Sequence, residues 1–151
     1  MQFDILVRTL ARMEVSPQLV MWVGLALLSR KVALRVCTWS PGLPQGSALS
    51  PVLFNVYTVG ITSNQLEGPG RTYSFADDVL VYRSGRVREE VARSAQEEID
   101  RIGEWCETHN GKLHPDKACV LWCSLNNHAV KATMPTVSIQ GKILSREHLL
   151  K

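Results

Sequence analysis

Two short stretches of strand-like sequence, residues 72–75 and 79–82, are separated by Asp77 and Asp78, and no other feature constrains the fold as strongly. An abrupt polar break between two apolar β patterns predicts a hairpin with the aspartates at its tip. Two neighbouring carboxylates repel each other unless a metal ion or a base offsets their charge. The pair therefore predicts either a divalent-cation site or a solvated turn in which the aspartates satisfy backbone donors.

Hydrophobic periodicity predicts the remaining elements. A spacing of three and four between apolar residues predicts helices over residues 2–13, 17–28, 47 to about 58, and 87–109. The second of these is apolar nearly all round, so we expect it to be largely buried. Alternation predicts strands over residues 31–39 and 118–123, and a hairpin over 137–144. Strands with helices packed on one face indicate the α+β class, with a small antiparallel sheet.

The segment from Pro41 to Gly46 interrupts this pattern. It holds two prolines, which lack N–H donors, and two glycines, which favour unusual backbone dihedrals. No regular element continues through such a segment, so a shaped loop is expected. Ser47, directly after it, is suited to cap the following helix.

Length and composition limit the classes of protein to which the chain can belong. Its 151 residues, 45% of them hydrophobic, suffice for one ordinary globular domain with a real core. The longest apolar run is about half of the roughly 20 residues that a membrane span needs. The sequence shows no secretory signal, so an intracellular protein with reduced cysteines is expected. The formal net charge of +3 is compatible with a nucleic-acid partner but does not establish one.

A zinc site is an alternative source of chemistry. Four potential ligands, Cys106, His109, Cys119 and Cys123, lie within eighteen residues. If residues 118–123 form a strand, however, the Cα atoms of its two cysteines are about 13 Å apart. That separation is too large for one tetrahedral ion without a bend, so the sequence disfavours this site.

Three blocks of sequence resemble those of one known family. Residues 42–57, GLPQGSALSPVLFNVY, resemble a loop and helix of the reverse transcriptase palm. Residues 75–78, FADD, are similar to the metal-binding turn of that family, and residues 113–117, LHPDK, resemble its next block. The order and spacing of the blocks also match. The style of residues 121–127 most resembles reverse transcriptases of non-LTR retrotransposons.

The resemblance implies a partial right-hand polymerase palm that acts as an RNA-directed DNA polymerase. Its chemistry would be nucleotidyl transfer assisted by two divalent ions, a role for which Mg²⁺ is suited and Mn²⁺ is an alternative. Asp77 would be the principal metal ligand and Asp78 the second. Lys117 would face the incoming triphosphate, where it neutralises charge or protonates the leaving pyrophosphate. A solvated surface lysine explains Lys117 equally well.

Further residues would contact template and nucleotide if the resemblance holds. They are Pro44, Gln45, Gly46, Ser47, Phe75 and Ala76. The absence of a side chain at Gly46 would let a base or sugar approach closely, although a helix entry shaped by glycine explains the same residue. The implied partners are an RNA template, a primer DNA and deoxynucleoside triphosphates, in the nucleus or cytoplasm, with no membrane.

The resemblance covers residues 1–151 as a single partial domain. The family also has an aspartate-bearing block upstream and a thumb downstream, and neither is matched in this sequence. Asp4 lies on the wrong side of the pattern to replace the upstream aspartate. We therefore expect the isolated chain not to polymerise DNA. The alternative is a noncatalytic retroelement remnant that binds nucleic acid or another chain through an exposed sheet edge or truncated core.

Overall fold

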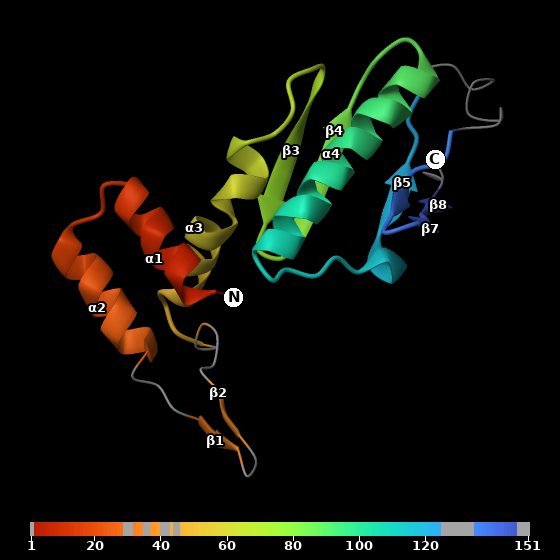
Figure 1. Ribbon diagram of the computed structural model, residues 1–151. Helices are drawn as coiled ribbons and strands as arrows, with labels where there is room; N and C mark the ends of the chain where they lie inside the picture. The colour runs from red at the N-terminus through yellow and green to blue at the C-terminus, as the bar shows by residue number, and fades with distance from the viewer. Residues whose placement is uncertain are drawn as a thin grey trace. The chain divides into compact units, whose positions relative to one another are not determined.

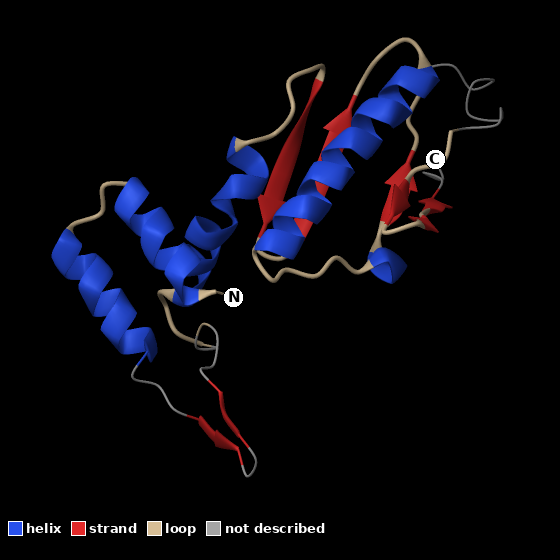
Figure 2. Ribbon diagram, viewed as in Figure 1, coloured by secondary structure: helices blue, strands red, loops and turns tan. Residues whose placement is uncertain are grey.

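The computed structural model describes residues 2–28, 32–34, 37–39, 43, 46–124 and 135–147. The chain forms two compact units, Met1–Ser63 and Asn64–Lys151, called here the first and second units. Helices and short paired strands occur in both (Figures 1 and 2). The predicted α+β class is therefore confirmed.

The first unit is built around α1 (Phe3–Arg12), which packs against both α2 and α3. Apolar residues recur along one face of α1, and Leu6 and Leu10 on that face are buried. The backbone N–H of Gln2, just before the helix, donates to the hydroxyl of Tyr57 in α3 at 3.3 Å. The helix expected over residues 2–13 is confirmed.

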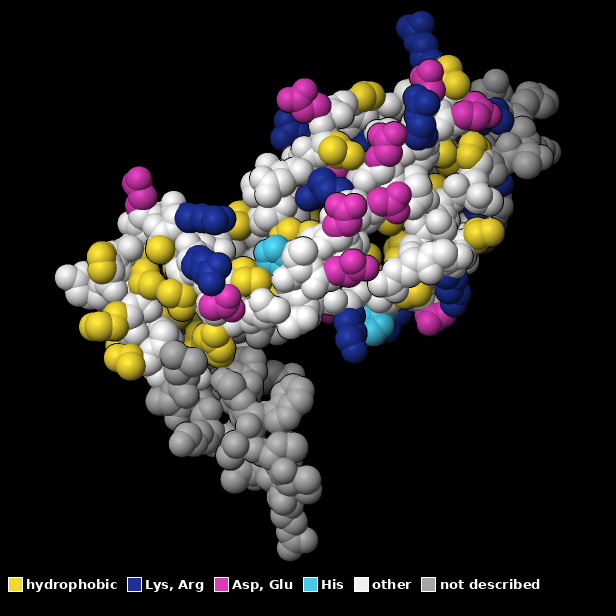
Figure 3. Space-filling view, viewed as in Figure 1, with side chains coloured by type: hydrophobic (Ala, Val, Ile, Leu, Met, Phe, Trp, Pro, Cys, Tyr) yellow, Lys and Arg dark blue, Asp and Glu magenta, His cyan; other side chains and the backbone are white. Residues whose placement is uncertain are grey.

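Helix α2 (Pro17–Leu28) forms where the sequence predicts it, but the expectation that it is largely buried is wrong. Val23 and Leu27 are buried, whereas Met21, Trp22 and Leu25 are each more than half exposed. Because α2 packs against α1, one stripe of it is covered and the opposite stripe is not. Figure 3 shows apolar side chains gathered over this helix.

The single strand expected over residues 31–39 is also wrong. The chain forms two short strands instead, β1 (Val32–Leu34) and β2 (Cys37–Trp39). They pair antiparallel, with Leu34 opposite Cys37. An alternating pattern reports which residues share a face, but it does not show where the chain reverses.

Helix α3 (Ser50–Ser63) completes the first unit and extends beyond the predicted end near residue 58. Its buried side chains include Leu53, Tyr57 and Ile61, spaced by four residues. Ser47 acts at its start: the Ser47 hydroxyl accepts the N–H of Leu49 at 3.4 Å. Leu49 lies before the first residue of α3, so this contact closes the turn that leads into the helix and does not cap a helical N–H.

The second unit contains the predicted hairpin, formed by β3 (Gly70–Phe75) and β4 (Asp78–Arg83). Helix α4 (Arg88–Thr108) packs against β4. Thr72 lies on the covered face of the hairpin and is buried. The expectations of a hairpin, a long helix after it and a helix on one face are all confirmed.

The last elements of the second unit are short. A 3₁₀ turn, η1 (Pro115–Lys117), precedes β5 (Cys119–Leu121), which pairs parallel with β8 (Ser145–Glu147). The predicted C-terminal hairpin is confirmed as β6 (Ser138–Ile139) and β7 (Lys142–Ile143). The described strands thus form four two-stranded sheets, and β5 with β8 is the one parallel pair among them. None of the helices in the described residues is long and apolar enough to cross a membrane.

Candidate functional site

The tip of the β3–β4 hairpin presents Asp77 and Asp78 to solvent. The strands pair in register from Gly70 opposite Arg83 to Phe75 opposite Asp78, which leaves a two-residue turn. The first turn residue, Ala76, has φ 51°, a region that favours glycine because a Cβ is crowded there. Both aspartates are exposed. The polar break of the sequence is therefore a tight turn with two consecutive carboxylates.

Both ligands of the predicted metal site, Asp77 and Asp78, are among the residues that the structure describes. Among those residues, no group of three or more His, Cys, Asp or Glu side chains lies close enough to hold a metal ion. Asp77 and Asp78 therefore offer two protein ligands. A pair of carboxylates still fits Mg²⁺, which is usually held by one or two carboxylates together with water and substrate phosphates. The same absence of a cluster gives the zinc alternative no support.

The face of the hairpin opposite α4 carries apolar side chains. Successive strand residues point to opposite faces, so Tyr73 and Phe75 lie on the face opposite that of buried Thr72. Phe75 is 85% exposed, and Leu80, which is directly opposite Tyr73, is 63% exposed. Phe75 was predicted to contact template or nucleotide, and its exposure leaves it free for such a contact.

The loop predicted to bind nucleotide belongs to the first unit, and the structure describes it in part. Pro44 and Gln45 lie outside the described residues. Gly46 is exposed and has φ 82°, and a Cβ built on it would meet nothing within 4 Å. The backbone conformation therefore explains the glycine without any close neighbour. Ser47 lies beside it, three residues before α3, where its hydroxyl accepts a hydrogen bond from the Leu49 N–H.

Lys117 ends η1 and is exposed, as a residue that meets a triphosphate must be. Its backbone N–H donates to the carbonyl of His114 at 3.0 Å, which fixes the local turn. The neighbouring Asp116 forms an ion pair with Lys142 of β7. The Lys142 ammonium hydrogen-bonded to Asp116 holds the pKa of that carboxyl below its usual value. The pair ties η1 to the β6–β7 hairpin.

Sequence reasoning missed the buried carboxylate of Glu98, which lies on the inner face of α4 and is 0% exposed. The sequence does contain a signal for position 98, because the series 91, 95, 98, 102 and 106 has helical spacing. A charged residue at one of these positions predicts a buried ion pair.

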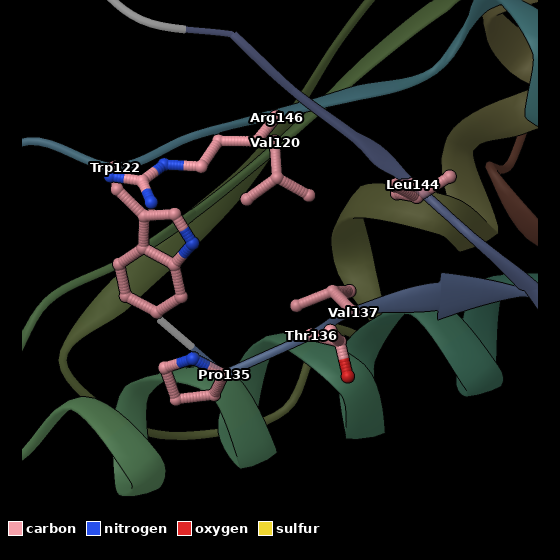
Figure 4. A pocket seen from close by; sticks show the side chains of 7 residues that line it. All are labelled: Val120, Trp122, Pro135, Thr136, Val137, Leu144 and Arg146. Atoms are coloured by element: carbon pink, nitrogen blue, oxygen red, sulfur yellow. The ribbon is translucent and has the colours of Figure 1, made fainter. Parts of the chain in front are cut away.

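A small cavity of about 90 Å³ lies in the second unit. Figure 4 shows its lining, in which the Arg146 side chain extends toward Trp122. The other residues that line it are Val120, Pro135, Thr136, Val137 and Leu144. None of the predicted site residues is among them.

An antiparallel hairpin with two aspartates at its turn, in an α+β chain, agrees with the class of protein that the sequence blocks indicate. The family described as reverse transcriptase (RNA-dependent DNA polymerase) matches residues 1–139. The chain belongs to this family.

Three curated relatives illustrate the likeness. The chain is 31% identical over 110 residues to a probable RNA-directed DNA polymerase from transposon BS of Drosophila melanogaster, a match that covers 70% of this chain and 12% of the relative. It is 28% identical to the RNA-directed DNA polymerase from mobile element jockey of Drosophila funebris, a match that covers 73% of this chain and 12% of the relative. It is 34% identical to a retrovirus-related Pol polyprotein from the type-1 retrotransposable element R1 2 of Nasonia vitripennis, a match that covers 68% of this chain and 26% of the relative. The chain thus spans about an eighth to a quarter of these relatives. No solved structure matches.

Proposed function

We propose that both units belong to one partial reverse transcriptase domain, residues 1–151, that contributes palm elements to template-directed DNA synthesis. The observation that carries the proposal is the pair of exposed carboxylates, Asp77 and Asp78, at the tip of a tight hairpin in a chain of this family. The substrates would be an RNA template, a primer DNA and deoxynucleoside triphosphates. The reaction would take place in the nucleus or cytoplasm.

The residues of the hairpin and of η1 would divide the work of nucleotidyl transfer. Asp77 and Asp78 would hold divalent cations, Mg²⁺ or Mn²⁺, against the triphosphate. When bound, such ions stabilise the attacking 3′ oxygen and the leaving oxygen. The Lys117 ammonium would offset triphosphate charge or donate a proton from Nζ to the departing pyrophosphate. Phe75 and Ala76, together with residues 44–47, would position template and nucleotide.

We further propose that the isolated chain does not extend primers. Its described residues supply two carboxylates and no third ligand near them. Phosphoryl transfer depends on preorganised charge around the reacting phosphate, and an incomplete ligand set leaves the ions poorly held. Cation binding is therefore the more direct test of the proposed site, and primer extension tests the inactivity.

The experiment is a Mn²⁺ titration followed by electron paramagnetic resonance, with the intact chain and with the Asp77→Asn/Asp78→Asn variant. We expect the variant to lose at least tenfold in affinity, because both protein ligands lose their charge. A matched control is Glu89→Gln/Glu90→Gln, which neutralises another pair of consecutive exposed carboxylates, at the start of α4. Equal Mn²⁺ binding by all three proteins would contradict the metal site.

Primer extension with a primed RNA template and Mg²⁺ completes the test. We expect no product from the chain or from the double aspartate variant, with circular dichroism showing that both are folded. Extension by the unmodified chain alone would show that another group supplies the third ligand and would overturn the proposed inactivity.

A noncatalytic, partner-binding role is the second candidate, and the exposed apolar stripe of α2 favours it. Met21, Trp22 and Leu25 are 63%, 54% and 61% exposed, and large exposed apolar patches mark interaction surfaces. This role predicts concentration-dependent association that Trp22→Lys reduces. It also predicts no Mn²⁺ affinity beyond that of the double aspartate variant. Salt-sensitive RNA binding without cation binding would identify nucleic acid as the partner.

A further inference from the structure

The carboxylate of Glu98 is the most completely enclosed charged group among the described residues. It is 0% exposed on the inner face of α4. Its Oε1 accepts one hydrogen bond from the Thr72 hydroxyl at 2.7 Å and another from the Arg101 guanidinium at 2.6 Å. Its Oε2 accepts the backbone N–H of Leu66 at 2.9 Å and lies 3.1 Å from Arg83 Nη2. Both oxygens therefore have two partners.

These partners come from different segments of the second unit. Thr72 belongs to β3, Arg83 to β4, and Leu66 to the connection before the hairpin. Arg101 lies one turn further along α4, and its side chain is 17% exposed. One carboxylate thus joins both strands of the hairpin, and the segment that leads into them, to a single position on the helix.

A buried charge has this many partners for an energetic reason. Removing an ionised carboxylate from water is strongly unfavourable unless ion pairs and hydrogen bonds replace its hydration. Burial by itself raises the pKa of Glu98, but Arg101, the Leu66 N–H and Thr72 outweigh it and hold the pKa below its usual value. Glu98 is therefore charged near neutral pH, and its two oxygens keep all four contacts only when both strands are in place.

The register of the hairpin links this network to its tip. Arg83 pairs with Gly70 and Thr72 pairs with Val81. The two strand residues that contact Glu98, Thr72 and Arg83, therefore lie on the same face of the hairpin, toward α4. From these pairs the ladder continues without interruption to Phe75 opposite Asp78. A shift of one strand against the other would break the contacts to Glu98 and would also displace the carboxylates at the turn.

We propose that Glu98 is a positioning residue for the cation site: by holding β3 and β4 on α4 in one register, it sets where Asp77 and Asp78 stand. The inference rests on the proposed function for the identity of the site, but not for the role of Glu98 in the hairpin. Glu98 touches neither aspartate and acts through the two strands.

The test compares Glu98→Gln with Thr58→Val and Glu97→Gln. The glutamine keeps two acceptor or donor atoms of similar shape but removes the charge that pairs with Arg83. Thr58 is a buried threonine in α3, hydrogen-bonded to the Phe54 carbonyl at 3.0 Å, so its replacement weakens the protein without touching the hairpin. Glu97 is exposed, so Glu97→Gln removes the same charge from the outer face of α4.

Two readouts are measured for each protein, after urea unfolding has given its free energy of unfolding and has shown that it is folded under the conditions used. For Glu98→Gln we expect Mn²⁺ affinity to fall about tenfold, as for residues that orient metal ligands. We also expect the amide chemical shifts of residues 75–79 to change more than in either control. A purely stabilising role predicts wild-type affinity and wild-type shifts in the folded variant, and that result would overturn the proposal.

Further outcomes separate this inference from the proposed function. If the unmodified chain binds no Mn²⁺ but Glu98→Gln shifts the amides of residues 75–79, the cation site fails and the positioning role stands. If the unmodified chain binds Mn²⁺ and Glu98→Gln changes neither readout, the cation site stands and the positioning role fails. Should Glu98→Gln not fold, Thr72→Val removes one hydrogen bond and keeps both ion pairs, and a smaller change in the same direction is expected. No change in that variant would overturn the proposal.

Discussion

The side-chain amide of Gln96 pairs with the backbone of Ser138 much as a neighbouring strand would. Gln96 Nε2 donates to the Ser138 carbonyl at 3.0 Å, and the Ser138 N–H donates to Gln96 Oε1 at 2.8 Å. The two residues are 42 positions apart, one on α4 and the other in β6. This pairing fastens the β6–β7 hairpin to the helix that also carries Glu98.

Replacing Gln96 by alanine should release that hairpin. Both backbone groups of Ser138 lose their partner, so we expect a loss of about 1 to 2 kcal/mol in the free energy of unfolding. The Ser138 amide should also lose its protection from hydrogen exchange. Glu97→Ala removes the next, exposed side chain and should leave that amide protected; equal exchange in both variants would contradict the pairing.

A side chain at Gly70 should disrupt the start of β3. Gly70 has φ 154°, and a Cβ there would overlap the carbonyl oxygen of Tyr82 and approach Arg83 Cα to 2.9 Å. Because backbone atoms cannot move aside cheaply, Gly70→Ala should destabilise the protein by roughly 2 kcal/mol or more.

The control for that substitution is Gly103→Ala in α4. A Cβ on Gly103 meets nothing within 4 Å, and alanine favours the helix by about 0.5 to 1 kcal/mol. Urea unfolding should therefore show a lower free energy of unfolding for Gly70→Ala and a higher one for Gly103→Ala. A stable Gly70→Ala variant would mean that the strands pair differently at this end.

Glycine at position 76 should stabilise the hairpin tip. Ala76 has φ 51°, a left-handed conformation that costs an L-residue about 1 kcal/mol more than glycine. Ala76→Gly should therefore raise the free energy of unfolding by a few tenths of a kcal/mol, after the greater freedom of glycine in the unfolded chain is included. Ala95→Gly, within α4, should instead lower it by about 1 kcal/mol. Destabilisation at both positions would argue against the turn.

Stability should fall in acid through Glu98. Its pKa in the folded protein lies below the reference value of 4.5, so its contribution to stability is fully present above pH 4.5. The contribution is lost as the pH falls through the lower folded pKa, where the buried carboxylate takes up a proton. Urea unfolding between pH 3 and 6 should show this loss in the intact chain and in Glu97→Gln. The slope should be smaller in Glu98→Gln, and an unchanged slope would contradict the assignment.

The cysteines should differ in their reactivity. Burial raises the pKa of the Cys106 thiol, whereas Cys119 and Cys123 are exposed. Because the thiolate is the reactive form, Cys106 should be alkylated at least tenfold more slowly than the other two. Mass spectrometry of a Cys37→Ser chain treated with iodoacetamide measures this. Urea should equalise the rates, and equal rates without urea would show that Cys106 is accessible.

The sequence predicts the elements of this fold better than their environment. Periodicity located α1 and α4, and the polar break at Asp77 located the hairpin, because each depends on neighbouring residues. The exposure of Trp22 was not predictable in this way. An apolar helix is buried only where a partner covers it, and the pattern does not state how many partners it has.

The candidate site shows the same division. Asp77, Asp78 and Lys117 could be selected from the chain because they lie in recognisable blocks. The burial of Glu98 follows from its place in the helical series of α4, but its partners could not be predicted, since Thr72 and Arg83 reach it through the pairing of two strands. A short-range pattern contains no record of such contacts between distant segments.

The exposure of Trp22 gives the apolar stripe of α2 an optical signal of its own. Indole fluorescence shifts to shorter wavelength when water is excluded from the ring, so any surface that covers α2 should shift the emission of Trp22. In a chain that retains Trp22 and has phenylalanine at its other three tryptophan positions, the emission spectrum can be recorded at each step of a dilution series. The concentration at which the emission shifts would show when another surface covers α2.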